Sequence, residues 1–147
     1  MRTFSLAFLI ATAALGAPAQ AAEHEVKMLN RGSSGEAMVF EPLVVKAAPG
    51  DTIVFTPTDK SHNSVSMKEG IPAGAQPWSG KINEKISVTV SEPGVYLYQC
   101  SPHVSMGMIG AVVVGEPKNL DAVKSVKFPG AAKKTAEKIF AEIKPGG

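Results

Sequence analysis

Apolar residues in this chain occur in short runs that are separated by turn-forming residues. The clearest run is residues 86–90, where apolar and polar side chains alternate strictly, as they do in a strand with one buried face. Turn signals such as Pro49-Gly50 and Pro93-Gly94 separate the runs. The other runs that we predict as strands are residues 25–30, 37–40, 43–47, 52–56, 63–66, 95–100 and 108–114. About eight short strands of this kind predict an all-β fold, an antiparallel sandwich or barrel.

Two regions depart from this strand pattern. The middle of the chain has no sustained period and predicts mostly loop, with one helical turn before Trp78. Residues 116–147 form a C-terminal extension in which two short helices are predicted. The first helix covers 120–126 with Asn119 as its N-cap, and the second covers 129–143. The second helix has apolar residues on one face and lysines on the other, so we expect it to pack against an edge of the sheet.

The N-terminus has the features of a secretory signal peptide. Arg2 gives a positive start, an apolar run follows, and a pattern of small residues ends at Ala21. We therefore predict a signal peptide over 1–21, or over 1–22 as the alternative, and one mature domain over 22–147. No later run approaches the roughly 20 apolar residues of a membrane span. The mature protein is expected to be soluble and exported to the periplasm.

Charge is nearly balanced along the chain, whose formal net charge is +2. Residues 22–115 carry seven basic against nine acidic side chains, whereas residues 116–147 carry seven against four. The small basic excess therefore lies in the C-terminal extension. It is too diffuse to indicate a nucleic-acid partner.

The chemically distinctive residues lie between the last two predicted strands. One stretch of nine residues contains Cys100, His103, Met106 and Met108. Thiolate, imidazole and thioether ligands suit copper better than magnesium or calcium, and a second histidine would complete a blue-copper ligand set. A single cysteine cannot form an internal disulfide, and metal binding would protect its thiol in an exported protein.

Two further histidines could supply the missing ligand. His24 lies close to the predicted cleavage site, where chain ends are usually mobile, so we expect no metal role for it. His62 lies at the entry to the short strand 63–66. Because it accompanies an unpaired cysteine and a downstream histidine in an exported β domain, we interpret His62 as the second imidazole ligand.

These residues resemble the type 1 copper motifs of the cupredoxins, the blue copper proteins, and among them those of the pseudoazurins. The matching motifs are His62-Asn63, Ile82-Asn-Glu84, Pro93-Gly94, Tyr98-Gln-Cys100-Ser-Pro-His103 and Met106-Gly-Met-Ile109. The two predicted C-terminal helices also fit, so the resemblance covers the whole mature chain. It implies a Greek-key β-sandwich of about eight strands. It also implies one type 1 copper ion bound by His62 Nδ1, Cys100 Sγ, His103 Nδ1 and, at a longer distance, Met108 Sδ.

Two methionines compete for the last ligand position. Met106 follows Cys100 by six residues, as in amicyanin-like loops, and Met108 follows it by eight, as in pseudoazurins and plastocyanins. The C-terminal helices favour Met108, which leaves Met106 as an exposed apolar contact near the copper. The resemblance further implies that Asn63 forms hydrogen bonds near the cysteine sulfur and ties the two ligand segments together. The alternative is a turn asparagine bonded to its own backbone.

Four protein ligands leave no open position for a substrate, which implies a one-electron carrier rather than an enzyme. Gln99 and Ser101 flank the cysteine where multicopper oxidases carry histidines, which argues against an oxidase or a copper nitrite reductase domain. By resemblance, the expected partners are a nitrite reductase of denitrification or a c-type cytochrome, bound transiently by a monomer. The alternatives are a copper-trafficking protein without a carrier role and a structural zinc site, because zinc accepts the same ligands.

The resemblance also implies an apolar patch over the histidine at position 103, where a redox partner docks. Lysines around such a patch would steer an acidic partner, an effect that salt weakens. The apolar candidates are Met38, Pro42, Pro102, Val104 and Met106, and the basic candidates are Lys60, Lys68 and Lys81.

Overall fold

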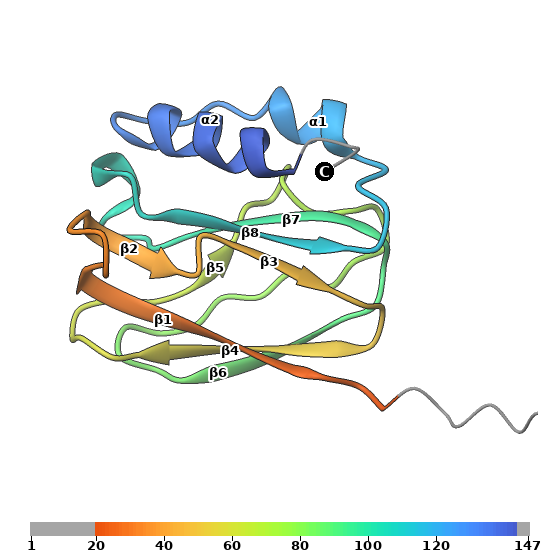
Figure 1. Ribbon diagram of the computed structural model, residues 1–147, viewed down its shortest axis with the longest axis horizontal. Coiled ribbons are helices and arrows are strands. Elements are labelled where there is room, and N and C mark those ends of the chain that lie inside the picture. The colour runs from red at the N-terminus through yellow and green to blue at the C-terminus, as the bar shows by residue number, and fades with distance from the viewer. Residues whose placement is uncertain (1–19, 144–147) are drawn as a thin grey trace, which may run out of the picture.

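Eight strands form two four-stranded sheets that face each other (Figure 1). The computed structural model describes residues 20–143. The first sheet has the order β2-β1-β4-β6, and its strands are Ala37–Glu41, Glu23–Arg31, Asp51–Pro57 and Ile86–Val90. The second sheet has the order β3-β8-β7-β5, and its strands are Val44–Ala47, Ile109–Val114, Gly94–Gln99 and Val65–Ser66. The predicted β-sandwich of about eight strands is confirmed.

The sheets are mixed, which corrects the prediction of an antiparallel fold. β1 pairs with β4 in parallel, and β3 pairs with β8 in parallel, while the remaining pairs are antiparallel. The chain leaves the first sheet after β2, enters the second sheet at β3 and returns at β4. Alternation of apolar and polar residues identifies a strand but carries no information on the direction of its neighbour.

The core between the sheets is built from alternate residues of the strands, whose side chains point to the same face. Tyr96, Tyr98 and Cys100 of the β7 segment all point into it and are fully or almost fully buried. The ring of Tyr98 meets Phe40 and Phe55 edge-on, with a centroid distance of 4.8 Å to each. This core therefore ends at Cys100 and is continuous with the ligand residues.

Two helices, α1 (Leu120–Lys124) and α2 (Ala132–Glu142), cover the outer face of the second sheet (Figure 1). The expected packing against a sheet edge is therefore wrong. A second core lies between the helices and the outward residues of β7 and β8, and it contains Val95, Leu97, Ile109, Ala111, Val123, Ala136 and Ile139. All six residues of β8 are buried because this strand has a core on each face.

Three local predictions also need correction. The Asn119 side chain does not cap α1, because its Oδ1 accepts the Val95 N–H (2.7 Å) and its Nδ2 donates to the Val95 carbonyl (2.9 Å). α2 begins at Ala132 and not at 129, since Gly130 has a left-handed φ of 51°. The segment before Trp78 lies entirely within the described residues. It forms hydrogen-bonded turns and contains no helical turn.

The ends of the chain are only partly described. Of the predicted signal peptide, residues 1–19 lie outside the described part, as do residues 144–147 of the C-terminal extension. The division into a signal peptide and a mature domain therefore stays a prediction. Among residues 20–143, neither helix has the length and apolar character needed to cross a membrane.

Candidate metal centre

The loop that follows β7 is closed by its own backbone hydrogen bonds. It contains turns and a short 3-10 helix, η1 (Val104–Met106). The Cys100 N–H donates to the Met108 carbonyl (3.0 Å), and the N–H groups of His103 and Met108 donate to the carbonyls of Cys100 and His103 (3.1 and 3.2 Å). These bonds hold the residues of the predicted ligand set at fixed positions along the loop.

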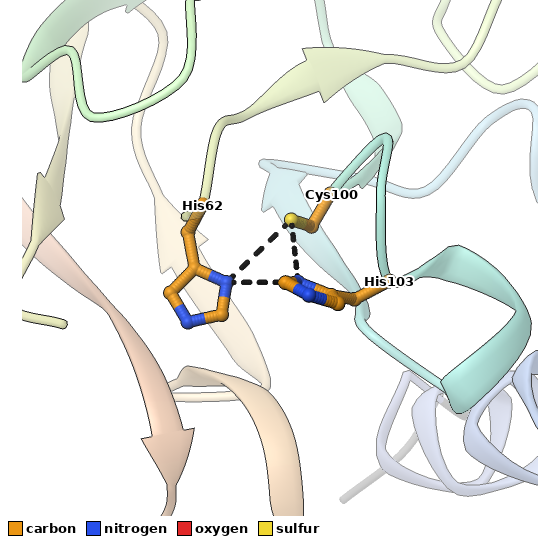
Figure 2. Close-up of side chains that lie close together, drawn as sticks. All are labelled: His62, Cys100 and His103. Atoms are coloured by element: carbon orange, nitrogen blue, oxygen red, sulfur yellow. Dashed lines mark hydrogen bonds between the residues drawn. The ribbon is translucent and has the colours of Figure 1, made fainter. Parts of the chain in front are cut away.

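Three of the predicted ligand atoms form a small triangle (Figure 2). The distance between His62 Nδ1 and His103 Nδ1 is 3.1 Å. Cys100 Sγ lies 3.7 Å from His62 Nδ1 and 3.5 Å from His103 Nδ1. Figure 2 shows His62 entering from the segment before β5, while Cys100 and His103 come from the loop between β7 and β8.

The size of this triangle fits a metal ion. The centre of a triangle with these sides lies about 2.0 Å from each corner, which matches the usual metal–nitrogen distance of about 2.0–2.1 Å and approaches the metal–sulfur distance of about 2.3 Å. Two imidazoles and one thiolate in a trigonal arrangement are the ligand set typical of blue copper. The three side chains therefore fit copper in both geometry and chemistry.

The two candidate methionines have opposite surroundings. Met108 is fully buried and belongs to the same core cluster as Cys100, and its backbone is bonded to Cys100 and His103. Met106, at the end of η1, is 53% exposed. Together with the triangle, buried Met108 completes the arrangement of a type 1 copper site.

Asn30, near the end of β1, orients His62 and was missed in the sequence. Its Oδ1 lies 2.9 Å from His62 Nε2, so the protonated Nε2 donates to Asn30 and leaves the Nδ1 lone pair directed at the triangle. Burial lowers the pKa of His62, and the neighbouring His103 acts in the same direction, which favours a neutral imidazole that can bind a metal. No local pattern marks Asn30, because it is 32 residues from His62.

Asn63 joins the two ligand segments. Its Oδ1 accepts the Ser101 N–H (2.8 Å), and its Nδ2 donates to the Gly80 carbonyl (3.0 Å) and to Ser101 Oγ (3.2 Å). The side chain is buried, so each of these hydrogen bonds is costly to remove. These bonds to distant segments differ from the alternative of a turn asparagine bonded to its own backbone.

The thiol of Cys100 is fully buried, and burial raises its pKa. The backbone N–H groups of Asn63 and His103 act in the opposite direction because they donate toward the sulfur. A buried thiolate needs a nearby positive charge, and a bound metal ion supplies one.

The C-terminal helices also support the ligand loop. The Ala131 N–H, at the start of α2, donates to the Ser105 carbonyl of η1 at 2.9 Å. A Cβ added at Gly107 would lie 3.0 Å from Thr135 Oγ1, so α2 and the loop are in close contact. The helical extension therefore braces the loop as well as covering the sheet.

The predicted patch residues are not all in one place. Pro42 and Met106 line one groove of about 470 Å³ beside the ligand loop, together with residues of α2. Met38 and Val104 are half-buried, and each packs against a core cluster. Pro102, Lys60 and Lys81 are exposed, whereas Lys68 lines a different groove with Trp78.

His24 lies apart from the triangle, as expected. Its Nε2 is 2.8 Å from Asp51 Oδ2 at the start of β4, and the same carboxylate accepts the N–H groups of Ala22 (2.8 Å) and Ala48 (2.9 Å). These hydrogen bonds, led by the one from His24, lower the pKa of Asp51 to about 2. The start of β1 is thus anchored and is not a loose chain end.

Known proteins are similar to this chain in sequence and in fold. Residues 26–115 match the family model described as copper binding proteins, plastocyanin/azurin family. A pseudoazurin from Paracoccus pantotrophus is 55% identical over 131 residues, which cover 88% of each chain. A putative pseudoazurin from Rhizobium leguminosarum bv. viciae is 47% identical and covers 93% of this chain and 92% of its own. A solved pseudoazurin structure from a Sinorhizobium has a TM-score of 0.83 at 62% identity, covering 86% of this chain and 99% of that chain.

The chain therefore belongs to the plastocyanin/azurin family of copper binding proteins, the cupredoxins. Within that family it is similar to the pseudoazurins, in sequence over most of its length and in structure. These similarities confirm the predicted cupredoxin fold and copper cofactor. They also confirm the prediction of an electron-transfer protein rather than an enzyme.

Proposed function

We propose that this protein is a soluble periplasmic electron carrier that passes single electrons to a respiratory reductase. The observation that carries the proposal is the triangle of His62 Nδ1, Cys100 Sγ and His103 Nδ1 on two segments held together by the fold. Such a site needs little rearrangement when the charge of its ion changes. Rigid positioning of this kind suits repeated electron transfer better than metal delivery, which requires the ligands to open.

We assign the ligand roles to His62 Nδ1, Cys100 Sγ, His103 Nδ1 and, as a weaker ligand, Met108 Sδ. A bound copper ion supplies a one-electron couple between Cu(II) and Cu(I). Asn30 holds His62 in the tautomer that binds metal, and Asn63 keeps the His62 and Cys100 segments together. Buried Met108 and the surrounding core exclude water from the inner side of the site.

Electrons leave and enter through the half-buried ring of His103. The candidate docking patch comprises Met38, Pro42, Pro102, Val104 and Met106, of which Pro42, Pro102 and Met106 are exposed. Lys60, Lys68 and Lys81 are the candidate steering lysines, of which Lys60 and Lys81 flank the His62 segment. The expected partners are a nitrite reductase of denitrification and c-type cytochromes, met by a monomeric carrier.

The N-terminal segment directs export and is removed from the mature protein. We place the cleavage after Ala21, with 22–147 as the mature domain. The pattern of small residues before Ala22 supports this position. Mass spectrometry of the protein recovered from the periplasm gives the N-terminus directly, and a cytoplasmic full-length chain would disprove export.

Copper titration of the apoprotein tests the site. One equivalent of Cu(II) should produce an intense visible band from thiolate-to-copper charge transfer, and the Cys100→Ser variant should lack it. A colourless protein that binds zinc in preference would contradict the copper carrier. Stopped-flow mixing of the reduced protein with a nitrite reductase then tests the role. A blue protein that cannot deliver electrons to a reductase or a cytochrome would instead support copper trafficking.

A further inference from the structure

The residues that follow the proposed cleavage site place several nitrogen donors close together. Cleavage after Ala21 makes Ala22-Glu23-His24 the new N-terminus. An α-amino group, two backbone amides and a histidine in third position can wrap one ion in consecutive short chelate rings. Planar nitrogen sites of this kind select Cu(II) or Ni(II).

The structure already gathers two of these donors on one carboxylate. The backbone nitrogen of Ala22 lies 2.8 Å from Asp51 Oδ1, and His24 Nε2 lies 2.8 Å from Asp51 Oδ2. Asp51 is 6% exposed, and its pairing with Ala22 and His24 joins the start of β1 to the start of β4. The amino terminus and the imidazole are therefore neighbours before any metal binds.

The contact with Asp51 also determines which ring nitrogen of His24 is free to bind a metal ion. A chelate that includes the N-terminal amine needs this nitrogen to be Nδ1. A carboxylate that accepts from Nε2–H leaves the lone pair of the imidazole on Nδ1, the nitrogen nearer the backbone. Histidines that bind metals commonly donate their other ring N–H to a carboxylate in this way. The His24 side chain is 28% exposed, so solvent ions can reach it.

We propose that the processed chain has a second metal site, in which the Ala22 amine, the Glu23 and His24 amide nitrogens and His24 Nδ1 bind one Cu(II) or Ni(II) ion. The amine enters as NH₂, and both amides lose their protons on binding. Ala22 and His24 Nε2 keep N–H groups for Asp51, so the carboxylate continues to orient the site.

The position of the site at the very start of β1 makes this binding compatible with the fold. Glu23 and His24 are the first two residues of β1, paired with Thr52 and Ile53 of β4. Metal binding therefore disturbs only these first two positions of the ladder between β1 and β4. The rest of β1, including Asn30 beside the copper triangle, keeps its neighbours.

This inference rests on the proposed cleavage after Ala21, and the two are tested separately. Mass spectrometry of the exported protein shows whether Ala22 is the natural N-terminus. The metal site is tested on protein prepared directly with Ala22 as its first residue, so its failure leaves the cleavage assignment standing.

The decisive experiment adds a second equivalent of Cu(II) to this protein after the type 1 site has been filled. A second paramagnetic signal, with the wide copper hyperfine splitting of a planar nitrogen site, should appear while the blue band is unchanged. Ni(II) should also bind in a one-to-one ratio when the type 1 site is already filled with copper. If no second equivalent binds, the proposal is wrong.

Two matched variants identify the donors. One added glycine before Ala22 moves the amine out of the chelate but leaves His24 and Asp51 in place, and it should abolish the second signal. His24→Gln should do the same. Asp51→Asn should weaken binding by about 10- to 100-fold, the usual cost of losing a partner of a ligating histidine. Retention of the second signal in the extended chain would overturn the assignment.

Discussion

The two histidines of the copper site have contrasting surroundings. His62 is fully buried, and Asn30 holds its Nε2 from the end of β1. His103 is half-buried, and within residues 20–143 its ring has no hydrogen-bond partner beyond His62 and Cys100. One side of the site is thus fixed by contacts across the whole fold, whereas the other side depends on the geometry of one short loop.

This contrast separates two requirements of an electron carrier. Constant geometry around the metal is maintained by the buried side, where Asn30 and Asn63 tie the ligands to distant segments. Access for a partner is provided by the exposed side, where η1 ends in exposed Met106. Changes on the buried side should therefore alter copper binding, and changes on the exposed side should alter electron transfer.

Removal of each imidazole gives the largest expected effect and tests the contrast directly. His62→Gly and His103→Gly should both lose the blue band. External imidazole should restore a coloured copper site in His103→Gly, because solvent reaches that position, but not in His62→Gly, which is enclosed by the core. Optical titration with imidazole measures this, and equal rescue of both variants would contradict the contrast.

Loss of the hydrogen bond from His62 to Asn30 should have the next largest effect on copper binding. Asn30→Ala should weaken copper binding by about 10- to 100-fold, because the ring loses the partner that fixes its tautomer. Asn30→Asp keeps an acceptor at this position and should retain most of the affinity. Competition titrations with a chelator give both values, and equal affinities for all three proteins would exclude an orienting role.

On the exposed side, Met106→Gln should slow electron transfer to a reductase by up to about tenfold, since it makes the contact surface polar. Its spectrum should not change, and its free energy of unfolding should stay within about 0.5 kcal/mol of the original. Stopped-flow kinetics measure the rate. A changed blue band would mean that Met106 and not Met108 is the ligand.

The smallest effect on the copper site is expected from a change of Asp51, which lies at the start of β4 and contacts the start of β1. Asp51 has a folded-state pKa of about 2, below its usual value of 3.8. Its ionised form therefore stabilises the fold above about pH 4, and this contribution is lost as the pH falls toward 2. Asp51→Asn should be less stable at neutral pH, and the difference should shrink between pH 4 and 2. Urea unfolding measures it, and the blue band at neutral pH is the control.

Much of this arrangement could be predicted because it is written in local patterns. All eight strands lie within two residues of their predicted ranges, since alternation and turn residues act over a few neighbouring positions. The short spacing from Cys100 to Met108 and the isolated motif at His62 were sufficient to predict a copper site.

Contacts between distant segments could not be predicted in this way. Asn119 has the identity of a helix cap, yet its amide bonds to Val95 because α1 lies against β7. The amphipathic pattern of α2 shows that one face is buried but does not say against which surface. Asn30 and Asp51 are polar residues in ordinary strand contexts, and only their partners give them a role.

The strands, the ligand types and their spacing along the loop can be predicted from local sequence, because they depend on near neighbours in the chain. The strand directions, the placement of the helices over the second sheet and the partners of each histidine depend on tertiary contacts. Those features depend on which surfaces meet when the sheets close. The same closure brings His62 to Cys100 across 38 residues of sequence and leaves His103 at the surface.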